Sequence, residues 1–299
     1  MYVVLGASGN TGHLVAKNLL ARKQKVRVVG RNSARLQPLA AEGAEVFIGD
    51  LSDAQALTKA LTGADSAYVM IPPNLTSNDV RAFQERVSDA IASAVRKAGV
   101  KHVVSLSSVG ADKASGTGPV VGLHNLEQKL NRIDGANVLH LRAGYFMENT
   151  LPQVGAIRMT GSVVGPLRPD LKVAMIATRD IGAAATDALL QLAFRGKQTQ
   201  ELLGKRDLDY NEAASIIGNG IGKPDLGYTQ LPDHQAKAAL VQMGMSEDLV
   251  RLLLEMAGAL NAGTMRALEP RSARNSTPTP YETFVAEEFV PAYQHQAAA

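Results

Sequence analysis

The sequence contains no cysteine and no tryptophan among its 299 residues. Without cysteine the chain can form neither disulfides nor thiolate zinc sites, and it has neither iron–sulfur ligands nor a cysteine nucleophile. The six histidines show no His-Glu-x-x-His pattern and no other paired spacing, so we expect no metal. A Gly-x-Ser-x-Gly nucleophile elbow and a phosphate loop ending in Gly-Lys-Ser or Gly-Lys-Thr are also missing.

Charge of one sign and long apolar runs are equally scarce. Lysine and arginine number 31 and aspartate and glutamate 28, which leaves a net charge of +3 without any basic cluster. Nucleic acid is therefore not expected as a ligand. No apolar run approaches the roughly 18 to 20 residues that cross a bilayer, so we expect no membrane association. The chain starts directly in a strand, Tyr2–Leu5, with no signal peptide before it, and we expect a cytoplasmic protein.

Hydrophobic residues make up 45% of the chain, as in globular proteins. In the first half, short apolar runs alternate with stretches of helical spacing. The clearest helical stripe runs from Val80 to Val95 and ends near Gly99. The predicted strands are Tyr2–Leu5, Val26–Val29, Glu45–Ile48, Ala67–Ile71, His102–Leu106 and Val138–Leu141. Strands that are apolar throughout and separated by helices indicate an α/β fold with a doubly wound parallel sheet.

We predict two regions. Residues 1–150 form the sheet domain, and residues 151–299 form a smaller, mostly helical region that covers the sheet edge as a lid. The two are partly interleaved, because strands near 173–176 and 202–203 are expected to return to the sheet. Further helices are expected over Asp180–Phe194, Tyr210–Ile217 and Tyr281–Phe289, and two more over Asp233–Leu260, divided at Gly244–Ser246.

A glycine-rich loop follows the first strand and reads Gly6, Ala7, Ser8, Gly9, Asn10, Thr11 and Gly12. It has a strand before it, a helix after it and a second strand within about 30 residues, which is the context of a dinucleotide-binding loop of the Rossmann type. Gly6 permits a tight turn, Gly9 lets the backbone approach a pyrophosphate and Gly12 brings helix against strand. The helix start supplies amide donors, and the three polar residues add side-chain donors. The alternative is an ordinary strand–turn–helix connection.

The second predicted strand ends in Gly30, Arg31 and Asn32. An NAD site usually has Asp or Glu there, which binds the 2′-hydroxyl of the ribose. Here Gly30 occupies the position of that acidic residue, and the cationic Arg31 follows it. Arg31 can pair bidentately with a 2′-phosphate, with help from Asn32, so we predict NADP(H) rather than NAD(H) as the cofactor. In the alternative interpretation Arg31 only ends a strand.

Other strand ends meet at the same edge of the sheet. Asp50 and Leu51 follow the third strand, where a carboxylate can meet the adenine amino group; alternatively, Asp50 caps the helix that begins near Asp53. Ile71 and Pro72 close the fourth strand and form a rigid wall suited to lie beside the adenosine ribose. These strand-end residues are predicted to contact the cofactor.

Six motifs follow one another in a distinctive order: Gly6–Gly12, Gly30–Asn32, Val69–Pro73, Ser105–Ser108, His124–Glu127 and Leu141–Asn149. In this order the sequence resembles the NmrA-like family of atypical short-chain dehydrogenases, which includes type 2 NADPH quinone reductases and redox-sensing transcription co-regulators. The likeness runs from residue 1 to about 290 and is most specific through Asn149. It implies either an NADP(H)-dependent oxidoreductase or a protein that senses NADP(H) and regulates a partner.

Short-chain dehydrogenases that reduce ketones use a Tyr-x-x-x-Lys pair, in which lysine lowers the pKa of the proton-donating tyrosine. None of the seven tyrosines here has a lysine four positions on. At the expected place Val120 stands for the tyrosine and His124 for the lysine. We therefore expect a quinone or similar conjugated acceptor, whose reduction needs less proton assistance, with His124 or water protonating it later. His124 as an ordinary helix residue is the alternative.

The segment after the sixth strand is expected at the level of the nicotinamide. Gly144 allows close approach, and Tyr145 with Phe146 can stack on the ring or on a flat acceptor; core packing is their alternative. Ser107 can donate to the carboxamide or to a substrate oxygen. We expect His124 and Tyr145 as the catalytic residues. Hydride transfer to an aromatic or quinone-like substrate and NADP(H) sensing without turnover both stay open, as do a homodimer and a protein partner.

Overall fold

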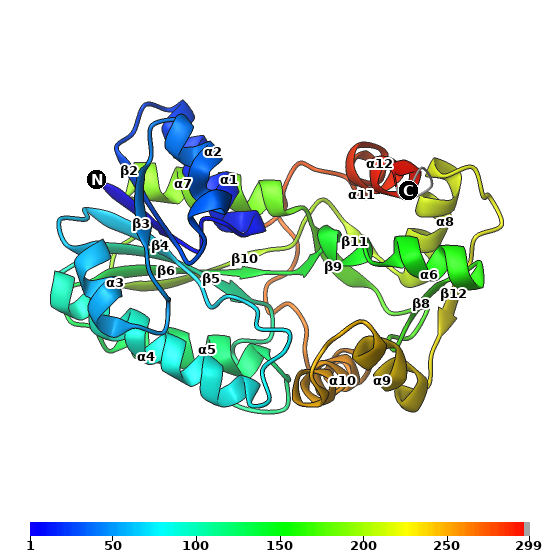
Figure 1. The fold of residues 1–299 in the computed structure, drawn as a ribbon. Helices are drawn as coiled ribbons and strands as arrows, with labels where there is room; N and C mark the ends of the chain where they lie inside the picture. Colours follow the sequence, from blue (N-terminus) through cyan, green and yellow to red (C-terminus); the bar gives the residue numbers. More distant parts are fainter. Residues whose placement is uncertain (296–299) are drawn as a thin grey trace.

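Seven parallel strands form the main sheet of the computed structural model, which describes residues 1–295 (Figure 1). Their order across the sheet is β10-β6-β5-β4-β1-β2-β3. In chain order they are β1 (Tyr2–Leu5), β2 (Val26–Gly30), β3 (Glu45–Ile48), β4 (Ser66–Val69), β5 (His102–Ser108), β6 (Asn137–Ala143) and β10 (Lys197–Leu202). The order reverses between β1 and β4, and ligands of such sheets bind at that reversal, beyond the carboxyl ends of the strands. The predicted doubly wound sheet is confirmed.

Helices cover both faces of this sheet (Figure 1). One face carries α1 (Asn10–Ala21), α2 (Ser33–Ala41) and α7 (Thr178–Gln191), and the other carries α3 (Ala54–Leu61), α4 (Val80–Ala98) and α5 (Val120–Asn131). Successive residues of β1 enter different cores: Val3 and Leu5 pack into one, and Val4 packs into the other. This two-sided burial explains why the strand is apolar throughout.

Two smaller sheets lie beyond the carboxyl ends of the main strands. One contains β11 (Asp207–Leu208), β9 (Val173–Ile176) and β7 (Tyr145–Phe146), and the other pairs β12 (Tyr228–Gln230) with β8 (Val163–Gly165). The prediction that the chain returns to the main sheet near 202–203 agrees with β10, which pairs with β6. The same prediction for 173–176 is wrong, because β10 already occupies the edge beside β6 and β9 pairs with β7 instead.

The remaining helices belong to the second half of the chain. They are a 3-10 turn (Met147–Thr150), α6 (Gln153–Thr160), α8 (Tyr210–Gly220), α9 (Asp233–Gln242), α10 (Glu247–Asn261), α11 (Tyr281–Phe284), a π-helical turn (Val285–Phe289) and α12 (Val290–His295). The predicted division of 233–260 is confirmed, because Gly244 has a φ of +86° and Ser246 caps α10. No helix within residues 1–295 is long and apolar enough to cross a membrane.

Candidate functional site

A single cavity of about 1000 Å³ lies where the strands of the main sheet end. The predicted residues that line it are Gly6, Ser8, Gly9, Asn10, Thr11, Arg31, Asp50, Leu51, Ile71, Pro72, Ser107, Gly144, Tyr145 and Phe146. Three predicted residues are not part of the lining: Gly12, Asn32 and His124. The chain segments that the sequence placed at one sheet edge therefore do meet in one chamber.

Backbone contacts between the glycines shape the glycine loop. Gly6 has a φ of +68°, a conformation that favours glycine, and its carbonyl accepts a hydrogen bond of 2.9 Å from the Gly9 amide. A Cβ on Gly12 would lie 2.5 Å from that same carbonyl oxygen, so Gly12 serves the close packing of α1 on the loop. Helix α1 has no side-chain cap and no acidic residue in its first turn. Its first amides therefore present donors and a partial positive charge to the cavity, which fits a pyrophosphate.

The Arg31 side chain lies at the end of the cavity beyond β2. It is 65% exposed, and its closest acid, Asp50, is 4.0 Å away, so the guanidinium keeps donors for an anion. Arg35 lines the same end of the cavity. Asn32 has a different role, because its side chain accepts a hydrogen bond from the Arg35 amide and caps α2. These contacts fit a phosphate held by Arg31 and Arg35.

Asp50 does not cap α3. That position belongs to Asp53, which accepts the amides of Gln55 and Ala56 at 2.8 and 3.0 Å. Asp50 instead accepts both the amide and the hydroxyl of Ser52, each at 2.8 Å. Burial alone would raise the pKa of Asp50, but the Ser52 hydrogen bonds and the Arg31 charge lower it below its ordinary value. An ionised carboxylate therefore stands at this end of the cavity.

A buried ion pair supports the cavity wall at the end of β5. Ser107 donates to Glu127 at 2.6 Å, and Arg142 donates to both oxygens of Glu127, at 3.0 and 2.6 Å. Since the Ser107 hydrogen is used for Glu127, this hydroxyl offers a ligand an acceptor and not the expected donor. The sequence analysis did not assign Glu127 and Arg142 to the site, although Arg142 is a charge within an otherwise largely apolar strand.

Gly144 and Tyr145 shape the wall after β6. A Cβ on Gly144 would lie 2.4 Å from the Ala174 carbonyl oxygen, so this glycine lets the chain pass close to β9. The Tyr145 ring meets Tyr210 edge to face, with centroids 6.2 Å apart. Burial raises the pKa of Tyr145, so its phenol is protonated at neutral pH. Tyr145 and Phe146 both line the cavity, and we call these two residues the aromatic wall.

His124 is not among the residues that line this chamber. Its Nδ1 lies 2.8 Å from the carbonyl oxygen of Ala111, and because a carbonyl only accepts, Nδ1 carries the hydrogen. Its neighbours Val120 and Leu123 do line the cavity. Within residues 1–295 there is no group of three or more histidine or acidic side chains placed to hold a metal ion.

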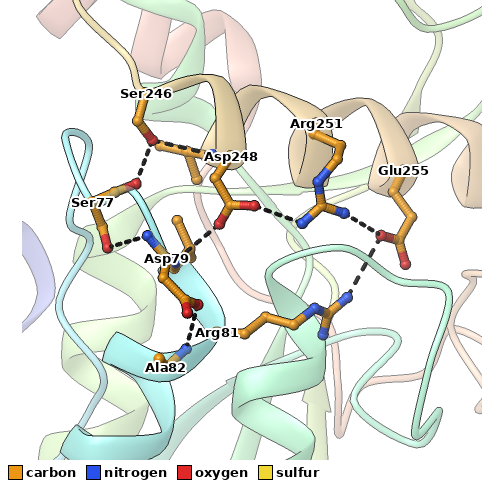
Figure 2. A network of polar contacts seen from close by, with 10 residues as sticks. Ser77, Asp79, Arg81, Ala82, Ser246, Asp248, Arg251 and Glu255 are labelled. Carbon is orange, nitrogen blue, oxygen red and sulfur yellow. Dashed lines mark hydrogen bonds and ion pairs between the residues drawn. The ribbon is translucent and has the colours of Figure 1, made fainter.

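Helix α10 covers the cavity with Met256 and Leu260, which the sequence analysis did not assign to the site. Its first turn is tied to the start of α4, and we call these bonds the latch (Figure 2). Ser246 donates its hydroxyl to the Ser77 carbonyl at 2.6 Å, and Asp248 accepts the Val80 amide at 2.9 Å. A methionine- and leucine-lined cover is thereby held to the domain that carries the glycine loop.

Asp248→Ala is expected to loosen the cover selectively. The loss of a carboxylate at a helix N-terminus costs about 1 kcal/mol, or about a fivefold higher population of the open form. Amide hydrogen exchange of residues 246–261 should accelerate accordingly, while the β1 amides keep their rate. Glu247→Ala is the matched control, because its side chain is 76% exposed and, within residues 1–295, its only ion pair is the surface one with Lys237. Equal acceleration in both variants would contradict the latch.

The latch also has a predicted pH dependence. The Val80 hydrogen bond, followed by the one from Arg251, lowers the pKa of Asp248. Because the pKa of Asp248 is lower in the folded state, its carboxylate stabilises the folded protein at every pH above the ordinary aspartate pKa of about 3.9. This stabilisation disappears as the pH falls through the pKa of the folded state. The protection factor of the wild-type cover, which is the exchange rate of unprotected amides relative to that of the cover at the same pH, should thus stay constant between neutral pH and about pH 5 and fall only in stronger acid.

Comparison with known proteins identifies the relatives of the chain. The model of the NmrA-like family matches residues 2–289. The NAD(P)H azoreductase of Xenophilus azovorans is 30% identical over 256 residues, with 86% of each chain covered. Quinone oxidoreductase 2 of Escherichia coli (strain K12) is 30% identical over 262 residues, which are 85% of this chain and 86% of that protein.

A solved structure agrees with these relatives. The NADPH-dependent quinone oxidoreductase of Escherichia coli, in complex with NADPH, matches with a TM-score of 0.79 at 25% identity. The match covers 99% of this chain and 100% of that one. The resemblance predicted from the six sequence motifs is confirmed, and so is the Rossmann-like sheet. The chain belongs to the NmrA-like family.

Proposed function

We propose that the protein is an NADPH-dependent reductase that transfers hydride to a quinone or a similar conjugated acceptor. One observation carries the proposal: a single cavity joins a phosphate-binding end, with free helix amides and Arg31, to an aromatic end with Tyr145 and Phe146. The relatives reported above, an azoreductase and quinone oxidoreductases, are named for reductions with NAD(P)H or NADPH, which supports the proposed chemistry.

The cofactor would be held by residues of four loops. The amides of Asn10 and Thr11 face the pyrophosphate, Arg31 and Arg35 hold the 2′-phosphate, and Pro72 lies against the adenosine. At the other end, Ser107 accepts a hydrogen bond from an amide or hydroxyl group, with Glu127 and Arg142 fixing its orientation. Bound NADPH supplies the hydride for the reaction.

The acceptor would lie between the aromatic wall and the cover. Met256 of the cover adapts to flat molecules of different outline, and the apolar lining excludes water from the reacting atoms. A quinone takes up the hydride, which is two electrons and one proton, and the resulting hydroquinone monoanion then takes a second proton from water. Since this proton need not move during hydride transfer, the missing Tyr-x-x-x-Lys pair is no obstacle.

Purified protein mixed with NADPH tests the proposal directly. Absorbance at the NADPH band should fall when benzoquinones, naphthoquinones or an azo dye are added, and it should stay constant without an acceptor. Calorimetry of the same protein should show NADPH binding. Binding without turnover for every acceptor would favour the NADP(H) sensor, and absence of binding would overturn both functions.

His124→Ala is expected to leave turnover nearly intact. The Nδ1 hydrogen bond to Ala111 is structural, and its loss costs about 1 kcal/mol of stability. Quinone turnover below the melting transition should change by less than about twofold. Tyr145→Ala serves as the comparison, because it removes part of the cavity wall and should raise KM. A His124→Ala variant with a large loss of kcat and normal folding would restore this histidine as a proton donor.

A further inference from the structure

The end of the cavity away from Arg31 contains a cation, Arg266, that has no polar partner in the described part of the chain. Arg266 is exposed and lines the cavity, and across the described residues its side chain has no hydrogen bond or ion pair. The two other cations at this end are engaged. Lys172 lies 3.5 and 3.6 Å from Asp209 and Glu212, and Arg271 donates to the carbonyls of Leu203 and Gly204.

The backbone that carries Arg266 is held on both sides. The preceding residue, Met265, is buried, packs against Gly110 and donates its amide to the Ala259 carbonyl at 3.1 Å. Further along, the amides of Leu268 and Glu269 donate to the buried Glu201 carboxylate, both at 2.9 Å. The positive charge is thus presented to the cavity from a fixed backbone position.

The phosphates of a dinucleotide do not account for this charge. Arg31 and Arg35 follow β2, whereas the segment around Arg266 is attached to Gly110 after β5 and to Glu201 on β10. These strands are three and five positions away from β2 in the sheet, which is about 14 to 24 Å at a spacing of about 4.8 Å. Arg266 therefore stands at the aromatic end, where the acceptor is proposed to bind.

We infer that Arg266 is a specificity residue for acceptors that carry an anionic group, such as a carboxylate, sulfonate or phosphate ester, beside the conjugated system. The inference rests on the proposed function for the reaction itself. A charge-assisted hydrogen bond in a partly enclosed, largely apolar cavity is stronger than the same contact in water. Glu269 also lines this end, so it disfavours an anion on its own side and restricts where the group can lie on the acceptor.

Turnover of a matched pair of acceptors tests the inference. 1,2-Naphthoquinone and its 4-sulfonate differ in the anionic group, and comparison between variants cancels their different intrinsic reactivities. Arg266→Gln is expected to lower kcat/KM for the sulfonate about tenfold to hundredfold relative to the neutral quinone. Arg266→Lys should recover part of the loss. Arg274→Gln is the matched control, because it removes the same charge from the same segment outside the cavity lining.

A binding measurement separates this inference from the proposed function. Naphthalene-2-sulfonate and 2-naphthol, which are not quinones, are titrated calorimetrically into the protein with and without NADP⁺. Arg266→Gln should weaken the binding of naphthalene-2-sulfonate and leave the binding of 2-naphthol unchanged. If no acceptor is turned over and this selective loss is seen, the reductase proposal fails and the anion site stands. If Arg266→Gln and Arg274→Gln change the sulfonate-to-neutral ratio equally, in turnover or in binding, the inference is overturned.

Discussion

Replacing Arg31 with glutamate is expected to weaken NADPH binding by about 100-fold while NADH binding changes little. The guanidinium is exposed and only 4.0 Å from its nearest acid, so it is available to the 2′-phosphate. The variant removes a charge-assisted hydrogen bond and adds a carboxylate beside Asp50, and both changes act against the phosphate. The 2′-hydroxyl of NADH is neutral, so NADH can bind beside either an arginine or a glutamate side chain at position 31.

Calorimetric dissociation constants for the two cofactors measure this effect. Lys17→Glu is the matched control, because it makes the same change of charge on the exposed side of α1, outside the cavity lining. It should alter NADPH binding only through long-range electrostatics, which added salt screens. An equal loss of NADPH and NADH in Arg31→Glu would contradict the assignment of Arg31 to the 2′-phosphate.

Removing the buried carboxylate beneath Ser107 is expected to cause the largest loss of stability. Glu127→Ala should lower the free energy of unfolding by about 3–5 kcal/mol, because the Arg142 guanidinium stays buried without its counter-ion. The Arg142 side chain is only 12% exposed, and a guanidinium is not deprotonated inside proteins, so Arg142 cannot lose its charge when Glu127 is removed. Urea unfolding followed by circular dichroism measures the change.

Two further variants isolate the buried charge as the cause. The double variant Glu127→Met with Arg142→Met should be more stable than Glu127→Ala, because it leaves neither charge unpaired. Glu85→Ala removes a surface partner of Lys129 and should cost less than about 1 kcal/mol. A Glu127→Ala variant no less stable than Glu85→Ala would show that the pair contributes little to the fold.

The main sheet could be predicted from the sequence because its signals are local. Val3, Val4 and Leu5 are all apolar since β1 is buried on both faces, and the same rule revealed the other core strands. Gly9 and Gly12 are spaced by the geometry of one turn, which depends on nearby atoms alone. Gly244 and Ser246 likewise ended and began neighbouring helices through their own backbone preference and capping.

The strand pairing and the side-chain orientations around the site depend on contacts between distant segments, which no local sequence pattern encodes. A strand over 173–176 was visible, but its partner β7 depends on which edge is already taken by β10. His124 has the spacing of a catalytic residue, yet its Nδ1 donates a hydrogen bond to the carbonyl of Ala111, thirteen positions away. The orientation of the Ser107 hydroxyl likewise follows from Glu127 on another element.

By itself, the sequence determined the layered sheet, the position of the glycine loop and the cation that replaces an acidic residue after β2. Each of these follows from the chemistry of residues close together in the chain. The tertiary structure alone decided which side chains line the cavity, which hydrogens are already used and which charge, that of Arg266, has no partner within residues 1–295. Those properties arise where segments more than a hundred residues apart in the sequence come within a few ångströms of one another. The distances between such residues are defined only when the whole chain has packed.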